Sequence, residues 1–385
     1  MPGLTKTPRP GLAGLLGLPA PLQSPFRPAG KAVYTMNGRN AIHLGLAALG
    51  VPAGAAVLLP SFHCTALVDP VIAYGARPEY YPVRADLDLD LDRVEAELIR
   101  TKAAALLAVH FFGWPAPIRA LREICDRRGA ALIEDCTHSL FCESEGAPLG
   151  SFGDIAVFSF RKTLPVQDGG ALVLRRPRAP FPMPHRLLPM AYQLRMAKWT
   201  LDAARAPDFA PQAVPAGTVP PLPVGAVHSP AAAGRGPDSQ EDPSFVADCL
   251  RFPMSLPSRL LFASANAGAV VAARRSNYAF LARRLARVTA LAPVFGELSE
   301  GVSPMGYPCL AGNGSWRWDY RLRARGVPVF SFGEVLHASL DAAAYPETRD
   351  LSARLVMLPV HQGCTETDLE RMASFVEAAF AGAPT

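Results

Sequence analysis

The sequence predicts an α/β protein with a mostly parallel central sheet flanked by helices, plus a smaller C-terminal α+β domain. Short runs of entirely apolar residues, such as 103–109 and 130–133, alternate with segments of helical spacing. Strands that are apolar on both faces are typical of a parallel sheet covered by helices on each side. The length of 385 residues exceeds what one hydrophobic core usually supports, which favours a second, smaller domain.

The first half of the chain alternates helix and strand after a Pro-rich N-terminal arm at residues 1–30. Segment 91–100 begins with acidic residues and ends with a basic one, as the helix dipole favours, and Gly129 stands at a helix C-cap position. The predicted helices are 40–49, 64–73, 91–100 and 118–128, and the predicted strands are 56–59, 78–83, 103–109, 130–133, 155–160 and 171–174.

The second half of the chain differs from the first in amino-acid composition. Residues 205–243 are so rich in Pro, Ala and Gly that we expect a long surface excursion within a large domain spanning 31–250. The small domain, 251–385, is expected to begin with one long helix or two abutting helices over 258–288, with the pairs Arg274-Arg275 and Arg283-Arg284 on a solvent-exposed face. Strands at 327–330 and 355–358 and a final helix at 366–380, capped by Thr365, complete it.

Composition narrows the class of partner. The chain has 38 basic and 33 acidic residues and a net charge of only +5, and its arginine pairs are scattered without the aromatic interleaving of a nucleic-acid surface. An anionic small molecule is therefore expected as ligand, and neither a nucleic acid nor a membrane is expected as partner. No window approaches the length of apolar sequence that spans a bilayer.

Cysteine usage indicates a reduced, cytoplasmic protein. The seven cysteines are an odd number at irregular spacing and include no CxxC pair. Cys136, His138 and Cys142 fall close together, but they lack the second ligand pair of a structural zinc site, so no metal is expected.

Four groups of residues are expected to meet where parallel strands end, which is where such sheets bind ligands. Gly38, Arg39 and Asn40 form a glycine turn that leads into a helix, an arrangement that either binds phosphate or is an ordinary helix start. Asp135 ends a buried strand, and it could hold a proton on a heterocyclic nitrogen or cap a helix.

His138, three residues further on, can bond a ring substituent or merely satisfy a backbone carbonyl. Ser159 can donate to a phosphate, and Lys162 can act as a nucleophile towards an aldehyde, although most lysines at strand ends are simply solvated. Lysine, aspartate, phosphate turn and parallel sheet together are typical of a fold-type-I pyridoxal-phosphate enzyme.

Beyond these residues, the chain resembles the DegT/StrS-type sugar aminotransferases. The resemblance covers residues 33–175 well and continues more faintly to the C-terminus, and its most specific block runs from Phe158 to Gly170, where Lys162 is followed by Asp168-Gly169-Gly170. The blocks that carry it are NGRNAIHLGLAALG, VLLPSFHCTALVDPVIAYGARPEYYPV, VHFFGWPAPIRALREICDRRGAALIEDCTHSL and GSFGDIAVFSFRKTLPVQDGGALVL.

The resemblance implies a role for each site residue. Lys162 would bind the cofactor, pyridoxal 5'-phosphate, and carry protons, Asp135 would pair with the pyridine nitrogen, and His138 would lie near the ring hydroxyl. Gly38, Arg39, Asn40 and Ser159 would bind the phosphate, and His63 or Cys64 would occupy the position that stacks on the cofactor.

The family further implies a homodimer whose amino donor is glutamate and whose acceptor is a nucleotide-linked keto sugar, in a pathway such as polysaccharide biosynthesis. Two alternatives stay open. One keeps the cofactor but changes the chemistry, to a non-sugar ketone or to a sugar dehydration. The other is a non-catalytic relative with a role in regulation or assembly.

Overall fold

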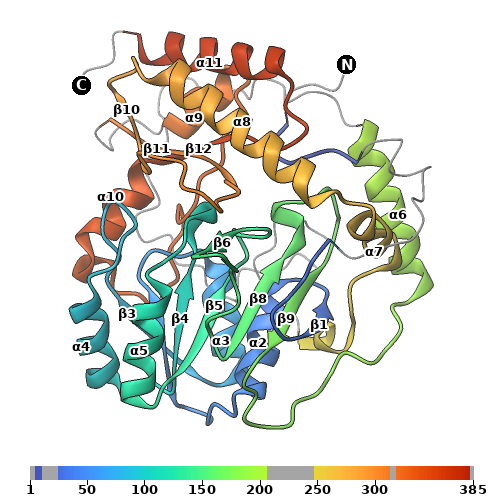
Figure 1. Cartoon of the computed structure of the whole chain (residues 1–385), viewed down its shortest axis with the longest axis vertical. Helices are drawn as coiled ribbons and strands as arrows, with labels where there is room; N and C mark the ends of the chain where they lie inside the picture. The colour runs from blue at the N-terminus through green and yellow to red at the C-terminus, as the bar shows by residue number, and fades with distance from the viewer. Residues whose placement is uncertain (1–4, 11–24, 206–246, 313–317, 382–385) are drawn as a thin grey trace.

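The main body of the protein is a seven-stranded sheet covered by helices (Figure 1). The computed structural model describes residues 5–10, 25–205, 247–312 and 318–381. The strand order is β1-β9-β8-β5-β4-β2-β3, with parallel pairing from β8 through β3 and antiparallel pairing of β9 with both β8 and β1. The strands are β1 (Lys31–Thr35), β2 (Ala56–Pro60), β3 (Arg77–Tyr81), β4 (Ala105–Val109), β5 (Ala131–Asp135), β8 (Ile155–Ser159) and β9 (Gly170–Leu174). The predicted mostly parallel sheet is confirmed.

Local sequence explains why these elements form where they do. Every residue of β2, β4, β5, β8 and β9 is buried, as the uninterrupted apolar runs predicted. The connecting helices are α2 (Gly38–Ala48), α3 (Thr65–Tyr74), α4 (Leu91–Thr101) and α5 (Ile118–Arg128). Helix α4 starts at Asp90, whose side chain accepts from the Arg93 amide, and α5 ends at Gly129 in the left-handed conformation that glycine adopts at low cost.

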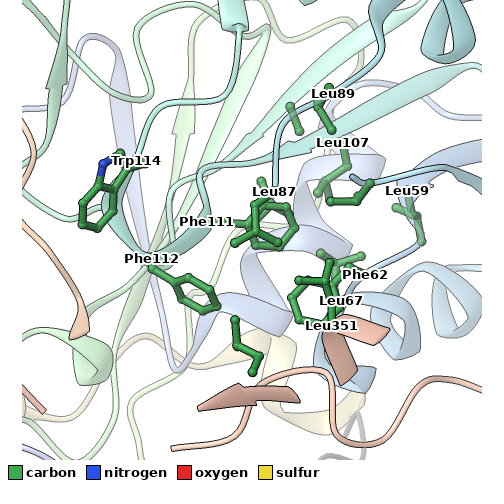
Figure 2. Packing of buried hydrophobic residues seen from close by; sticks show 14 of the residues in the cluster. Leu59, Phe62, Leu67, Leu87, Leu89, Leu107, Phe111, Phe112, Trp114 and Leu351 are labelled. Carbon is green, nitrogen blue, oxygen red and sulfur yellow. The ribbon is translucent and has the colours of Figure 1, made fainter. Parts of the chain in front are cut away.

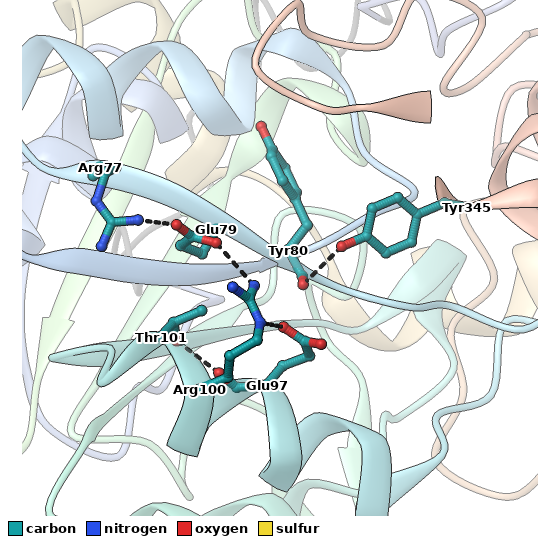
Figure 3. Close-up of polar contacts among 7 residues, drawn as sticks. All are labelled: Arg77, Glu79, Tyr80, Glu97, Arg100, Thr101 and Tyr345. Atoms are coloured by element: carbon teal, nitrogen blue, oxygen red, sulfur yellow. Dashed lines mark hydrogen bonds and ion pairs between the residues drawn. The ribbon is translucent and has the colours of Figure 1, made fainter. Parts of the chain in front are cut away.

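Edge strand β3 is closed off by polar groups rather than by another strand (Figure 3). Glu79 pairs with Arg77 and, at 3.1 Å, with Arg100 of α4. The Tyr345 hydroxyl donates to the Tyr80 carbonyl at 3.1 Å, so a segment far along the chain is fastened to this edge. Charged and capped edges of this kind oppose pairing with a second molecule.

A three-stranded antiparallel sheet, ordered β10-β11-β12, lies in the C-terminal part with helices around it. Helices α8 and α11 run across one end of the molecule in Figure 1. The strands are β10 (Leu291–Pro293), β11 (Gly306–Ala311) and β12 (Leu355–Pro359), and the helices are α8 (Ala267–Leu285), α9 (Trp318–Ala324), α10 (Pro346–Arg354) and α11 (Glu366–Phe380). Thr365 caps α11 in a capping box with Asp368, as predicted for Thr365.

Three expectations for this part need correction or completion. Residues 327–330 form no strand; only Phe330 pairs, through two hydrogen bonds of 2.9 Å with Met357, because Gly326 turns the chain and Pro328 has no amide hydrogen. Of the two alternatives predicted for 258–288, one long helix or two abutting helices, the structure has two helices, α7 (Leu256–Ala263) and α8, the second capped by Asn266. Arg274 is not on an exposed face: it is only 1% exposed.

Two further features complete the description. Helix α6 (Met190–Arg205) packs beside α7, whose Leu256 amide donates to Gln193 at 2.9 Å, and the predicted 205–243 excursion lies outside the described residues beyond Arg205. Among the described residues no single helix is long and apolar enough to cross a membrane; α7 and α8 together meet that criterion but are bent by 77° relative to each other.

One hydrophobic core joins the two sheets. A contiguous buried cluster contains residues of β2 and β4 together with β12 and α11. The rings of Phe62 and Phe111 lie 5.8 Å apart, and Figure 2 shows them in the same cluster as Leu351 of α10. The domain boundaries at 30 and 250 stay a prediction.

Candidate functional site

A cavity of about 540 Å³ opens at the carboxyl ends of β5 and β8. Six of the predicted site residues line it, and they come from four separate segments of the chain. They are Gly38, Arg39, Cys64, Asp135, Ser159 and Lys162. The fold therefore brings together side chains that are up to 124 residues apart, 162 minus 38, at the place where parallel sheets bind ligands.

The N-terminus of α2 forms one wall of this cavity. Asn37 caps the helix, its side-chain oxygen accepting from the Asn40 amide at 2.9 Å. The first amide groups of a helix have no partner within the helix, so this end favours an anion. Asn40 itself faces away from the cavity, since its side-chain nitrogen donates to the Cys249 carbonyl at 2.9 Å.

The acid-Gly-Gly sequence allows this turn to approach the sheet. A Cβ on Gly170 would lie 2.6 Å from the Phe158 carbonyl oxygen and 2.7 Å from the Asn37 carbonyl carbon, so only glycine fits there. Gly169 has a φ of +121°, a backbone conformation that residues with a Cβ atom rarely adopt. Asp168 accepts from the Ser255 amide at 3.0 Å and hydroxyl at 2.7 Å, which ties the motif to the start of α7.

Lys162 lies one short turn beyond β8. Phe160 is fully buried and anchors the 3-10 turn Phe160–Lys162, while the ammonium group of Lys162 donates to the Thr137 hydroxyl at 3.3 Å. The next carbonyl, of Thr163, accepts from Arg274 and from Gln362, both at 3.0 Å. Hydrogen bonds therefore hold both the side chain of Lys162 and the backbone just after it, and the lysine is partly exposed at the cavity.

Asp135 is the carboxylate of the cavity. It ends β5, is 4% exposed, and one of its oxygens accepts from the Thr137 amide at 2.8 Å. Within the described part of the chain, its other oxygen makes no hydrogen bond. Thr137 therefore contacts both Asp135 and Lys162, and sequence reasoning did not identify it.

Glu134 adjoins Asp135 but has a structural role, because successive strand residues point to opposite faces of a sheet. Its oxygens accept from the amides of Gly150 at 2.9 Å and Phe152 at 2.6 Å, from that of Gly153, and from His110 at 3.3 Å. Glu134, His110 and Cys136 offer three metal-ligand atoms within 4.8 Å of one another. These hydrogen bonds already occupy the carboxylate, so they account for the cluster without an ion.

We predict that Glu134→Gln destabilises the fold by about 3 kcal/mol, because it removes a buried carboxylate that accepts several hydrogen bonds and places an amide group against amide donors. Burial alone would raise the pKa of Glu134, but His110 and the Gly153 and Gly150 amides outweigh it and lower that pKa. The stabilisation is present above the unfolded-state pKa and is lost as pH falls below about 4. Urea unfolding at several pH values measures this, and equal stability of variant and wild type at pH 7 would contradict it.

His138 lies behind the cavity wall rather than in it. Its ring stacks on Phe112 with centroids 5.4 Å apart, and Nδ1 accepts from the Phe112 amide at 3.4 Å. Burial, and then the charge of Lys162, lower the pKa of His138 well below its usual value, so the ring is neutral at pH 7. Nε2 is buried and has no hydrogen-bond partner among the described residues.

The two residues expected to stack on a ligand differ in position. His63 does not line the cavity: Nδ1 bonds the Pro60 carbonyl at 3.1 Å, Nε2 accepts from the His337 amide at 3.2 Å, and the ring stacks on Tyr80. Cys64 does line it, and burial raises the pKa of its thiol, so it is uncharged at neutral pH. The aromatic rings among the described lining residues are Phe330 and His361.

The cavity carries an excess of positive charge. Its described lining contains one carboxylate, Asp135, and five basic residues: Lys6, Arg39, Arg161, Lys162 and Arg274. Lys6 and Arg274 come from the N-terminal segment and from α8, and nothing in the local sequence pattern indicated that they reach this site. Such a lining favours a ligand with several negative charges.

Comparison with known proteins gives a family for part of the chain. The model of the DegT/DnrJ/EryC1/StrS aminotransferase family matches residues 25–180, and the resemblance predicted from the sequence is confirmed over this part. GDP-perosamine synthase of Vibrio cholerae is 35% identical over 145 residues, which are 37% of this chain and 39% of that protein.

Two other relatives are named for different compounds. A dTDP-3-amino-3,4,6-trideoxy-alpha-D-glucose transaminase of Micromonospora megalomicea subsp. nigra is 39% identical over 36% of this chain and 37% of its own length. L-glutamine:2-deoxy-scyllo-inosose aminotransferase of Streptomyces kanamyceticus is 36% identical over 38% of this chain and 34% of its own length. The matched region thus spans less than half of each relative.

Solved structures extend the similarity of fold to nearly the whole chain. The aminotransferase TlmJ of Streptoalloteichus hindustanus has a TM-score of 0.64 at 23% identity, covering 92% of this chain and 86% of that one. A putative sugar aminotransferase of Streptococcus pneumoniae has a TM-score of 0.67 at 14% identity, covering 99% and 98%. The predicted fold-type-I architecture is confirmed.

Proposed function

We propose that this chain, whose residues 25–180 match the DegT/DnrJ/EryC1/StrS aminotransferase family, is a pyridoxal-phosphate-dependent aminotransferase. Its amino donor is glutamate, and its acceptor is a nucleotide-linked keto sugar. The observation that carries the proposal is the meeting of Lys162, Asp135 and the N-terminus of α2 at one cationic cavity. The names of the sequence relatives support the reaction type and the acceptor class.

The residues present fit the cofactor. The α2 N-terminus, Arg39 and Ser159 line one part of the cavity and are suited to a phosphate dianion. The unengaged oxygen of Asp135 is available to a protonated ring nitrogen, and Nζ of Lys162, once it has lost its proton, can attack an aldehyde. His138 does not line the cavity, so its contact with the ring hydroxyl stays a prediction.

The chemistry follows from what each side chain can do. When bound, pyridoxal phosphate supplies an aldehyde that receives the amino group and a ring that withdraws electrons from the reacting carbon. Asp135 keeps a proton on the ring nitrogen, which makes that withdrawal effective. Nζ of Lys162, as the neutral amine, would take the proton from the substrate carbon that bears the nitrogen and release it to the former aldehyde carbon, and the Thr137 hydroxyl, 3.3 Å away, would orient Nζ.

An absorption titration tests the proposal. Added pyridoxal phosphate is expected to give the wild-type protein a band near the edge of the visible range, glutamate is expected to bleach it, and a ketone acceptor is expected to restore it. A protein that stays colourless with the cofactor would rule out the enzyme and favour a non-catalytic relative.

A second acceptor class has support from the scyllo-inosose aminotransferase among the relatives, whose named substrate is a cyclitol ketone. The restoring step separates the two classes. Recovery of the band with nucleotide keto sugars supports the leading proposal. Recovery with cyclitol ketones or simple keto acids alone would show that the acceptor is not a nucleotide sugar. Release of a dehydrated sugar would show that the enzyme is a dehydratase and not an aminotransferase.

We also propose a cytoplasmic homodimer. Helices α6 and α7 lie side by side in Figure 1 and carry exposed apolar side chains. These are Met190, Leu194, Leu201, Leu256 and Leu260. Exposed apolar side chains on two neighbouring helices are suited to an interface with a second copy, and light scattering that gives the mass of one chain would refute the dimer.

A further inference from the structure

The carbonyl group of Thr163, the residue after Lys162, accepts hydrogen bonds from two side chains of the C-terminal part. Thr163 is buried, at 3% exposure, and its carbonyl oxygen accepts from Nη2 of Arg274 and from Nε2 of Gln362, both at 3.0 Å. A carbonyl oxygen has two lone pairs, so these two bonds satisfy it completely. Donors that are more than a hundred residues away in the sequence, 274 minus 163 and 362 minus 163, therefore fix the backbone beside the lysine.

Gln362 and Arg274 also bond each other, which closes a triangle of hydrogen bonds. Nε of Arg274 donates to Oε1 of Gln362 at 3.1 Å. A guanidinium has only donors, so the amide oxygen of Gln362 faces it and the amide nitrogen faces Thr163. An ionised glutamate at this position could accept from Arg274 but could not donate to Thr163, and a methionine could do neither.

Helix α8 holds the segment that carries Gln362. Arg274 is 1% exposed, and its Nη1 donates to the carbonyls of residues 304–305 at 3.0 and 3.1 Å. Asn277 of the same helix donates to the carbonyls of residues 360–361 at 3.3 and 3.1 Å. The triangle is thus anchored to the C-terminal part by bonds that do not involve Thr163.

The side chain of Lys162 has little else to hold it in place. Among the described residues Nζ makes one hydrogen bond, to Thr137 at 3.3 Å, which is longer than the usual length of about 2.9–3.0 Å. On the other side of the lysine, Phe160 is fully buried, and its carbonyl accepts from the amides of Thr163 at 3.1 Å and Leu164 at 2.8 Å. Because the lysine stem is flexible, the position of Nζ depends on the backbone from Phe160 to Thr163.

We propose that Gln362 is a positioning residue for Lys162, which acts through the Thr163 carbonyl and has Arg274 as its anchor. This inference rests on the proposed function and deepens it by naming a residue outside the cavity on which the reaction depends. Gln362 does not line the cavity, although its neighbour His361 does. A displacement of about 1 Å at a reacting group can slow a reaction about a hundredfold, so a looser backbone at this point reduces the rate.

Gln362→Met removes both hydrogen bonds while keeping the length of the side chain. On mixing with pyridoxal phosphate, the variant chain is expected to form the absorption band about tenfold more slowly than wild type, because Nζ is less often in place to attack the aldehyde. A single turnover with glutamate is expected to slow about tenfold to a hundredfold. KM for glutamate is expected to change less than about twofold, since Gln362 does not reach the substrate.

Gln362→Glu separates positioning from stability. The carboxylate would accept from Arg274, which has no carboxylate partner among the described residues, so the fold should be at least as stable as that of Gln362→Met. Because it cannot donate to Thr163, band formation and turnover are expected to be as slow as in Gln362→Met. Wild-type rates in Gln362→Glu, or rates that simply follow the urea midpoints of the three proteins, would make Gln362 a structural residue and overturn the proposal.

Asn277→Leu is the matched control, because it removes the bonds between α8 and residues 360–361 without touching Thr163. It is expected to lower the urea midpoint and to leave both rates within about twofold of wild type. Equal slowing by Asn277→Leu and Gln362→Met would contradict the positioning role. Wild-type rates in Gln362→Met reject this role alone, whereas absence of the band in wild type rejects the proposed function itself.

Discussion

Lys162→Ala is expected to abolish the visible absorption band and to slow amino transfer at least about a thousandfold. The alanine removes the nucleophile that would bind the cofactor aldehyde and the group that would carry a proton between the substrate carbon and the former aldehyde carbon. Its Nζ makes one hydrogen bond, 3.3 Å to Thr137, so little stability should be lost. Absorption spectra with added pyridoxal phosphate and initial rates with glutamate provide the two measurements.

Lys198→Ala is the matched control for this prediction. Lys198 is an exposed lysine of α6 that pairs with Asp202 one helical turn away, and its loss should leave both spectrum and rate as in wild type. A Lys162→Ala protein that kept the band and transferred amino groups at the control's rate would show that another residue holds the cofactor.

The parts of the fold that sequence could predict are those that local physics decides. A short run that is apolar on both faces predicts a buried strand, as in β4, and a glycine after a helical segment predicts the end of the helix, as Gly129 does for α5. Strand β11 escaped prediction because it contains Gly306 and Pro308, which usually interrupt strands. For residues 327–330 the error is the reverse: a strand is predicted, and only Phe330 pairs. An apolar composition does not tell whether a neighbouring strand is placed to form hydrogen bonds with the segment.

The candidate site divides in the same way. Lys162, Asp135 and Gly38 stand at element ends that a sequence can locate, and the parallel sheet then brings those ends together. His63 and Cys64 are adjacent, and which of them faces the cavity depends on the backbone of one short turn. From the sequence, Arg274 is predicted to be solvent-exposed together with its neighbour Arg275. The packing of α8 against residues 163 and 304–305 instead buries it beside the cavity.

Asp135→Asn is expected to retain the absorption band while turnover falls about a hundredfold to a thousandfold, the usual cost of losing one fixed charge at a reacting centre. Asparagine keeps an oxygen for the Thr137 amide, now bonded at 2.8 Å, so the fold and the cavity should persist. The neutral amide can no longer hold a proton on the ring nitrogen, so electrons are withdrawn less effectively from the reacting carbon.

Glu134→Gln provides a demanding comparison, because it makes the same chemical change one residue away on the opposite face of β5. It should lose stability but keep the turnover of each folded molecule, whereas Asp135→Asn should keep stability and lose turnover. Urea unfolding measures the stability of both variants, and single-turnover kinetics measures the turnover of their folded molecules. If Asp135→Asn instead lost stability and turned over normally, Asp135 would be a structural carboxylate like its neighbour, and the cavity would need another partner for the ring nitrogen.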